Sequence, residues 1–566
     1  MLRYPHNRAN LHRHGGDNPW ISDGGPHGWI TPAGEADAAI AGSVAADVTL
    51  DATLLGNFLR GASAVNVPDM NDPGPGAMTY YFPNGQSARM LWLHDQTAAA
   101  AHVNVYAGMA LPYLLSDNIE QDLVSRGVLP GANATLTLML QDKTFVPDDI
   151  ALQDARWNTS AWGQPGDLWF PHVYEALEDI NQSTGFNATG RWAWGPLFWP
   201  IFPARYELPS GAYGEASLTP EAWLDTPLVN GVAYPTVTVE PRPYRLRVLN
   251  ASNDRTMTFN LFVADDAVVM PGAGKTEVKK VPITTWSHPC DPGVTRSVAT
   301  TSTDPTTGLT STSWCTPETW SSDATVHPRG VPDWSAQGPT LYQIASDGGL
   351  LPGLAPKDAT PVTYLLDKGR AVVGNADLAN SGLHLANGER ADLVVDFSAY
   401  AGKTLIVYND AGNPEPGADP RNDYYTGYGD LSSTGGAEDT RPGYGPNTQT
   451  MMQIVVEPAA ISAVTPLATA AHETEIGIAY VASQDTPVVA QAAYNGAFGT
   501  TWNDSKAFGS IFTGSLKEPV FNFVPGDTTP AVFNSILVSN KGKGYVRPPA
   551  VALSGGNGTG ASATAS

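Results

Sequence analysis

Two histidines two positions apart, His12 and His14, stand near the start of the chain in the stretch ANLHRHGGDNPWISDGGPHGW. In an extended strand successive side chains point to opposite faces, so both imidazoles would project from one face, about 6.5–7 Å apart. Imidazole is a common metal ligand, and two at this spacing could serve neighbouring ions or be merely polar strand residues. Gly15 and Gly16 follow and let the backbone bend closely around whatever the histidines hold.

A second candidate group follows an apolar run in SARMLWLHDQTAAAAHVNVYAG, where His94 and Gln96 again share a face if the run is a strand. An amide is a poorer ligand for copper or zinc than imidazole. As an isolated pattern, His94 and Gln96 therefore make a weaker ligand pair than two imidazoles would. His102 is either a substitute ligand or structural, and His27, in the loop PHGW, is predicted to pack that loop.

The two cysteines, Cys290 and Cys315, lie in a Ser/Thr/Pro-rich stretch without a Cys-x-x-Cys motif. A disulfide that closes this loop is the favoured interpretation, ahead of two free thiols and of metal ligation. A disulfide would imply an oxidising compartment. A blue copper site needs a Cys thiolate with two His. His288 precedes Cys290 by two residues, but no His follows, so the sequence predicts no such site here.

Composition indicates short strands joined by turns. The 566 residues are enough for about three or four domains, and 57 Gly and 47 Pro favour a β-sandwich composition over a helical one. The net charge of −24 disfavours nucleic acid and anionic membranes as partners. No apolar run reaches the roughly 18–20 residues that span a bilayer.

Alternating residues predict individual strands. TLTLMLQDKTF (135–145) is typical of a half-buried strand that opens a second domain. TVTVEPRPYRLRVLNAS (236–252) predicts a sandwich hairpin with its turn at Pro241 and Pro243. The aromatic stretch at 190–209 is expected to pack against a neighbouring domain.

We expect four regions. A first β-sandwich domain occupies 1–133 and begins abruptly, as if incomplete. A second occupies 134–460, with an insertion at about 265–338 that holds both cysteines. Residues 461–530 are a linker and the beginning of a further domain, and 531–566 are a Gly/Ser-rich, β-repeat-like tail.

Several motifs in order resemble large bacterial multicopper oxidases: LHRHGGDNPWISDGGPHGWITPAGE, ARMLWLHDQ, NVYAGMALPYLLSD, DTPLVNGVAYPTVTVEP, YRLRVLNASN and GPTLYQIASDGG. The resemblance implies an all-β chain of tandem cupredoxin-like Greek-key β-sandwich domains. It also implies copper: a type-1 ion collects electrons from a reductant, and a trinuclear cluster of type-2 and type-3 ions reduces dioxygen to water.

The resemblance assigns ligands residue by residue. His12 matches the type-2 ligand, and His14 and His94 match type-3 ligands. The family carries His-Asp-His where this chain has His94-Asp95-Gln96, so Gln96 replaces a ligand. The family's other His pairs and its type-1 motif have no match, which predicts a partial copper site and a C-terminal copper region outside this chain.

The resemblance implies an oxidoreductase that couples one-electron oxidation of a small reducing substrate or metal ion to reduction of dioxygen, although this chain alone is expected to be inactive. The alternatives are a catalytically inactive copper-binding or surface scaffold and, more weakly, a metal-free β-sandwich module. With the disulfide, the resemblance implies an extracellular, periplasmic or cell-surface location.

Overall fold

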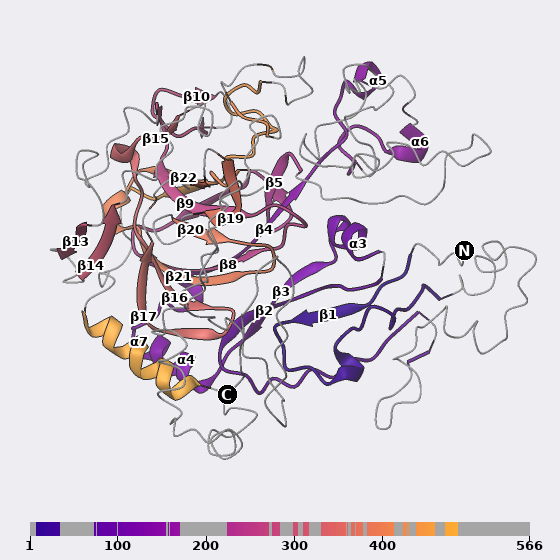
Figure 1. Cartoon of the computed structure of the whole chain (residues 1–566), viewed down its shortest axis with the longest axis horizontal. Coiled ribbons are helices and arrows are strands. Elements are labelled where there is room, and N and C mark those ends of the chain that lie inside the picture. Colours follow the sequence, from indigo (N-terminus) through magenta and orange to yellow (C-terminus); the bar gives the residue numbers. More distant parts are fainter. Residues whose placement is uncertain are drawn as a thin grey trace, which may run out of the picture. The chain divides into compact units, whose positions relative to one another are not determined.

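The computed structural model describes residues 7–33, 73–74, 76–98, 100–153, 157, 159–169, 224–270, 274–282, 298–303, 310–315, 330–357, 359, 364–367, 370–376, 382–412, 423–426, 430, 437, 439–458 and 470–484. The chain divides into two compact units, Met1–Gln484 and Asp485–Ser566, and every described residue lies in the first. Most regular structure in that part is β (Figure 1). The predicted all-β class is therefore confirmed.

Two sheets form a β-sandwich. The larger has seven strands, in spatial order β17 Gly349–Lys357, β16 Leu341–Ser346, β21 Arg390–Asp396, β8 Pro243–Asn250, β4 Thr135–Lys143, β5 Thr226–Val229 and β6 Val232–Ala233. The smaller has five, in the order β20 Leu383–Leu385, β9 Met257–Val263, β22 Thr404–Tyr408, β23 Thr450–Val456 and β7 Thr236–Val239. One core takes buried side chains from both sheets, among them Leu246 and Val248 of β8 and Phe259 and Leu261 of β9. Burial of each such side chain contributes about 1.5–3 kcal/mol.

The predicted strand at 135–145 is confirmed as β4, but the predicted hairpin at 236–252 is wrong. β7 pairs in parallel with β23 in the smaller sheet, and β8 pairs with β4 and β21 in the larger one. The connection at Pro241 thus crosses from one sheet to the other. Both strands turn alternate apolar residues into the same core, a pattern that strands facing each other across a sandwich share with strands that pair.

Helices cover the other face of the larger sheet. Leu123 of α4 (Asn118–Ser125) and Ile476 of α7 (Ala470–Ser483) pack against Ile344 of β16 in one buried cluster. The remaining helical elements are short: η1 Trp20–Ser22, α3 Ala101–Ala107, η2 Ala132–Ala134, α5 Ile150–Gln153, α6 Thr159–Trp162, η5 Trp334–Ala336 and η6 Ser398–Tyr400. No helix in the described ranges is long and apolar enough to cross a membrane.

A separate three-stranded sheet carries the first histidine motifs. Its strands are, in order, β1 Leu11–His14, β2 Arg89–Asp95 and β3 Ala110–Leu115. Met90 and Trp92 of β2 pack with Met139 of β4 and Leu249 of β8 in a buried cluster. This small sheet is therefore anchored on the seven-stranded sheet.

Four two-stranded ladders complete the β structure: β10 Val269–Met270 with β11 Gly274–Lys275, β12 Lys280–Val281 with β15 Val331–Pro332, β13 Val298–Thr303 with β14 Thr310–Cys315, and β18 Tyr364–Asp367 with β19 Arg370–Ala376. The first three fall within the predicted insertion at about 265–338. The predicted domain limits stay predictions. The aromatic stretch at 190–209 and the tail lie outside the described residues.

Candidate metal centre

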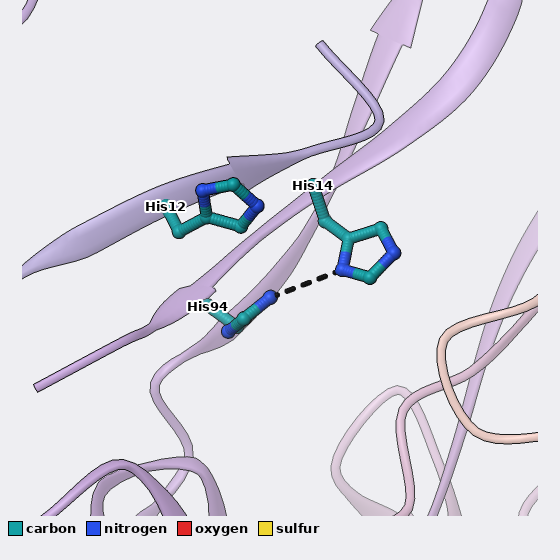
Figure 2. Close-up of side chains that lie close together, drawn as sticks. All are labelled: His12, His14 and His94. Carbon is teal, nitrogen blue, oxygen red and sulfur yellow. Dashed lines mark hydrogen bonds between the residues drawn. The ribbon is translucent and has the colours of Figure 1, made fainter. Parts of the chain in front are cut away.

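The register of β1 on β2 brings three histidines together. His12 lies directly opposite His94, and His14 lies opposite Trp92. In an antiparallel pair, opposite residues and residues two apart share one face of the sheet, so all three imidazoles project to the same side. Figure 2 shows the three rings converging from the two strands. The ring centroids lie 5.8 Å (His12–His14), 5.2 Å (His12–His94) and 5.4 Å (His14–His94) apart.

The spacing of the ring nitrogens suits metal ligation. One ligand atom from each histidine lies within 4.8 Å of the others, the one such group among the described residues. The closest contact is a hydrogen bond, at 3.3 Å, in which Nδ1–H of His14 donates to Nε2 of His94 (Figure 2); a bound ion would replace this proton. Two nitrogens about 2.0–2.1 Å from one tetrahedral ion would lie roughly 3.3–3.4 Å apart. His14 and His94 are thus spaced as two ligands of one ion.

Backbone carbonyls fix which nitrogens face the centre. Nδ1–H of His12 donates to the carbonyl oxygen of Asp23 at 2.5 Å, and Nδ1–H of His94 donates to the carbonyl of Asp95 at 2.8 Å. With Nδ1 occupied, each ring presents the lone pair of Nε2. The carboxylate of Asp23 also lies 3.4 Å from Nδ1 of His12, which favours this tautomer further.

The loop after β1 needs glycine where it returns to the histidines. Gly24 has φ +73°, and a Cβ there would lie 2.1 Å from the carbonyl oxygen of Leu11. A larger residue would therefore push the loop off β1 and move Asp23 away from His12. This is the physical role of a glycine in the stretch SDGG.

Buried polar contacts hold the two strands in register. The carboxylate of Asp95, wholly buried, accepts the backbone N–H of Asn10 at 2.8 Å and that of Thr97 at 2.9 Å. On the opposite face of β1, the buried guanidinium of Arg13 donates to Asn18 and Asn84 at 2.8 Å each. The residues next to each histidine thus fix the strands, while the histidines themselves stay available.

A second layer of residues comes from β2 and from the sandwich. The indole of Trp92 lies 4.2 Å from the ring of His94 and 5.3 Å from that of His14. Gly388, at φ +82° in the turn between β20 and β21, lies so close that a Cβ would be 3.4 Å from Cε1 of His14. Sequence reasoning missed Gly388, because no local pattern links it to a motif more than 350 residues earlier.

Burial keeps two of the imidazoles neutral. Desolvation lowers the pKa of His14 from 6.5 to about 4, with further lowering by the positive charge of Arg390 and by His94 and His12. Burial also lowers the pKa of His94, against a hydrogen bond to the Asp95 carbonyl that raises it. Both rings are therefore neutral at neutral pH, the form that binds a metal ion.

Neither His102 nor His27 contributes a ligand atom to this group. His102 lies on α3, outside the set of ligand atoms, and its buried Nε2 has no hydrogen-bond partner. Gln96 follows β2, and its backbone N–H donates to the carbonyl of Asn10. The role of its side-chain amide as a weak ligand stays a prediction. His27 is exposed and lies 6.0 Å from the ring of Trp29, as a loop-packing residue would.

The predicted disulfide falls on residues that the structure does not fully describe. Cys290 lies outside the described residues, and only the backbone of Cys315 is described, in β14. The pairing of the two cysteines therefore stays a prediction.

Known proteins similar to this chain are oxidases. A laccase of Bacillus stratosphericus is 25% identical over 419 residues, which cover 73% of this chain and 46% of the laccase. A laccase of Bacillus subtilis is 24% identical over 421 residues, with the same coverage of 73% and 46%. A bilirubin oxidase of Albifimbria verrucaria is 28% identical over 216 residues, 38% of this chain and 26% of that protein. The chain thus spans about half the length of the two laccases.

Other comparisons add little. No protein-family model matches the chain. Among solved structures, the laccase-like multi-copper oxidase CueO from Ochrobactrum sp. shares 15% identity, with a TM-score of 0.34 over 81% of this chain and 52% of that one. A TM-score this low does not support matching individual residues between the two structures.

Proposed function

We propose that this chain, which belongs to the multicopper oxidase family, supplies His12, His14 and His94 as ligands of part of a copper cluster. His14 and His94 would share one ion of the type-3 pair, and His12 would bind the type-2 ion. The observation that carries this assignment is the 3.3 Å approach of Nδ1 of His14 to Nε2 of His94. It is the spacing expected of two nitrogens on one metal ion.

The donor set fits copper. Three neutral imidazoles suit copper, whereas oxygen ligands would suit magnesium or calcium. The carboxylates of Asp23 and Asp95 lie beside the group but are engaged elsewhere: the Asp95 carboxylate accepts backbone N–H groups, and that of Asp23 accepts Nδ2–H of Asn18 at 3.1 Å. Copper would supply one-electron chemistry and the reduction of dioxygen to water.

The protein groups have separate tasks in this proposal. The Asp23 and Asp95 carbonyls each hold a proton on Nδ1 of a ligand ring and so aim its Nε2 at the centre. Trp92 and Gly388 limit the movement of His14 and keep water from that side of its ring. Such fixed support reduces the reorganisation that accompanies a change in charge at the site.

The whole protein, in this proposal, oxidises a small reducing substrate or metal ion one electron at a time and passes the electrons to dioxygen. Three imidazoles are fewer than the eight of the family's cluster, so we propose that the remaining ligands and the type-1 site belong to a further, C-terminal region of the same protein. The alternative, a catalytically inactive copper-binding or surface scaffold, has no support among the relatives named above, which are oxidases.

Copper loading of the purified chain tests the ligand assignment. We expect copper to bind, to give an EPR spectrum with nitrogen coupling, and to be lost in His14→Ala and His94→Ala. The matched control is His27→Ala, which removes an exposed histidine outside the group and should bind as much copper as the parent chain. Absence of copper, or equal copper in a variant lacking all three histidines, would overturn the assignment.

We further propose that the protein works in the extracellular space, in the periplasm or at the cell surface, as the resemblance and the predicted Cys290–Cys315 disulfide imply. Alkylation of the chain from its native host, without and with prior reduction, tests this location. A disulfide predicts that both cysteines become alkylated only after reduction. Full alkylation without a reductant would contradict it.

A further inference from the structure

Arg390 brings a buried positive charge from the sandwich to the edge of the histidine group. Its side chain is 3% exposed and stands at the first position of β21. Nε donates to the carbonyl of Met90 on β2 at 3.0 Å, and Nη1 donates to the carbonyl of Gly388 at 2.7 Å. These bonds fix the guanidinium between the two sheets.

The guanidinium lies directly behind His14. A Cβ on Gly15, the next residue, would be 2.6 Å from Nη2 of Arg390. Gly388, whose carbonyl Arg390 binds, itself approaches the ring of His14 on the side away from His94. Arg390 therefore sits behind one ligand of the proposed ion and does not ligate it.

The charge of Arg390 is only partly neutralised. Its nearest carboxylate, Oδ1 of Asp347, lies 3.4 Å from Nη1 and is 48% exposed, so water screens it. Two further charges act on Arg390: the cation Arg89 and the carboxylate of Glu389, which is exposed and therefore also screened by water. Among the charges that act on His14, that of Arg390 acts most strongly, so a buried positive charge stands beside the pair of His14 and His94.

We propose that the buried positive charge of Arg390 makes the ion site between His14 and His94 favour copper(I) over copper(II). The inference rests on the copper assignment proposed above. A fixed cation repels a doubly charged ion about twice as strongly as a singly charged one. At the effective dielectric constant of about 20 that applies in proteins, one unit charge several ångströms away changes a binding constant by about tenfold or more.

Three substitutions separate charge from packing. Arg390→Met removes the charge and keeps an unbranched chain. Arg390→Lys keeps the charge but loses the fork that binds two carbonyls. Asp347→Asn removes the counter-charge, while its amide oxygen can still accept the backbone N–H of Arg390, now bound at 2.8 Å.

The test measures the dissociation constants of copper(II) in air and copper(I) under anaerobic conditions, each by competition with a chelator of known affinity. The readout is the ratio of the copper(II) constant to the copper(I) constant. We expect Arg390→Met to lower this ratio about tenfold. We expect Asp347→Asn to raise it by about two- to fivefold, less because this carboxylate is screened. Arg390→Lys should leave it within about threefold of the parent value.

Opposite shifts for Arg390→Met and Asp347→Asn support the inference, since damage to packing would not give opposite signs. An unchanged ratio in both variants, or a shift of the same sign, overturns it while the copper site stands. If the parent chain binds neither ion, the copper assignment and this inference fall together. Circular dichroism and thermal melting check folding, and Asp347→Asn, at a half-exposed residue, provides the test if Arg390→Met does not fold.

Discussion

Gly388→Ala tests how strongly the sandwich supports the histidine group. The new methyl group would lie 3.4 Å from Cε1 of His14, 3.6 Å from its Nε2 and 3.6 Å from Cζ2 of Trp92. The first distance is at the tight limit of van der Waals contact and the other two are ordinary, so we expect the turn, which the new residue also strains at φ +82°, to shift against His14. Loss of support around a metal ligand typically lowers metal affinity by about 10- to 100-fold, and we expect a loss in this range.

The substitution also has a backbone cost that must be separated from its effect on the site. Gly388 has φ +82°, where an L-residue costs about 1–2 kcal/mol. Gly402→Ala is the matched control, because Gly402 has φ +74° and a Cβ there would meet only Pro458, at 3.9 Å. Both variants should melt a few degrees lower than the parent chain, at about 2–4 °C per kcal/mol.

Copper affinity then distinguishes the two variants. It should fall for Gly388→Ala and stay at the parent value for Gly402→Ala, measured by chelator competition beside a thermal melt. Parent-like affinity in Gly388→Ala would refute the idea that the turn supports His14. An equal loss in both variants would mean that affinity follows global stability and not local contact.

Three further predictions concern the residues that hold the fold and the strands. Glu120→Gln should lower the free energy of unfolding by about 3–5 kcal/mol, because it leaves two buried arginines, Arg245 and Arg247, without this partner. Glu475→Gln, at the solvent-exposed pair with Arg126, should change it far less, because water screens that pair. A comparable loss in both variants, measured by denaturant unfolding, would contradict this. Asp95→Asn should lower copper affinity about tenfold, because it replaces one of the two carboxylate oxygens that accept backbone N–H groups with an NH2 group, which donates. Unchanged copper affinity would show that the strand register does not need the carboxylate. Burial raises the pKa of Glu277, so the folded state binds a proton that the unfolded state has released, and stability falls as pH rises from about 4.5. Glu277→Gln should therefore melt higher than the parent chain at pH 8 and equally at pH 4, and a lower melting temperature at pH 8 would refute it.

The sequence predicts the strands better than their partners. Alternation in 236–252 correctly marks β7 and β8, yet it cannot tell whether two strands pair or face each other across a core. Pairing depends on contacts with β23, β4 and β21, which lie up to about 215 residues away along the chain. No local pattern encodes those contacts.

In the histidine group, too, the sequence predicts local features but not the pairing of strands. Spacing alone predicts that His12 and His14 share a face, but only the register of β1 on β2 places His94 opposite His12. The tautomers follow from the carbonyls of Asp23 and Asp95, one in a loop and one within β2. The residue types in the sequence suggest which side chains are ligands. Which ring nitrogen faces the centre depends instead on backbone carbonyls, which every residue has.

The residues that pack around the histidine group come from parts of the chain far from the histidines in sequence. Met90 and Trp92 are buried against Met139 and Leu249, and Arg390 binds the carbonyl of Met90. A segment limited to 1–133 would expose these side chains and leave the guanidinium and the Gly388 turn absent. Burial of two large apolar side chains contributes about 3–6 kcal/mol, which is comparable with the whole stability of many domains. The three histidines therefore depend on the sandwich for their arrangement, even though every one of them lies before it in the chain.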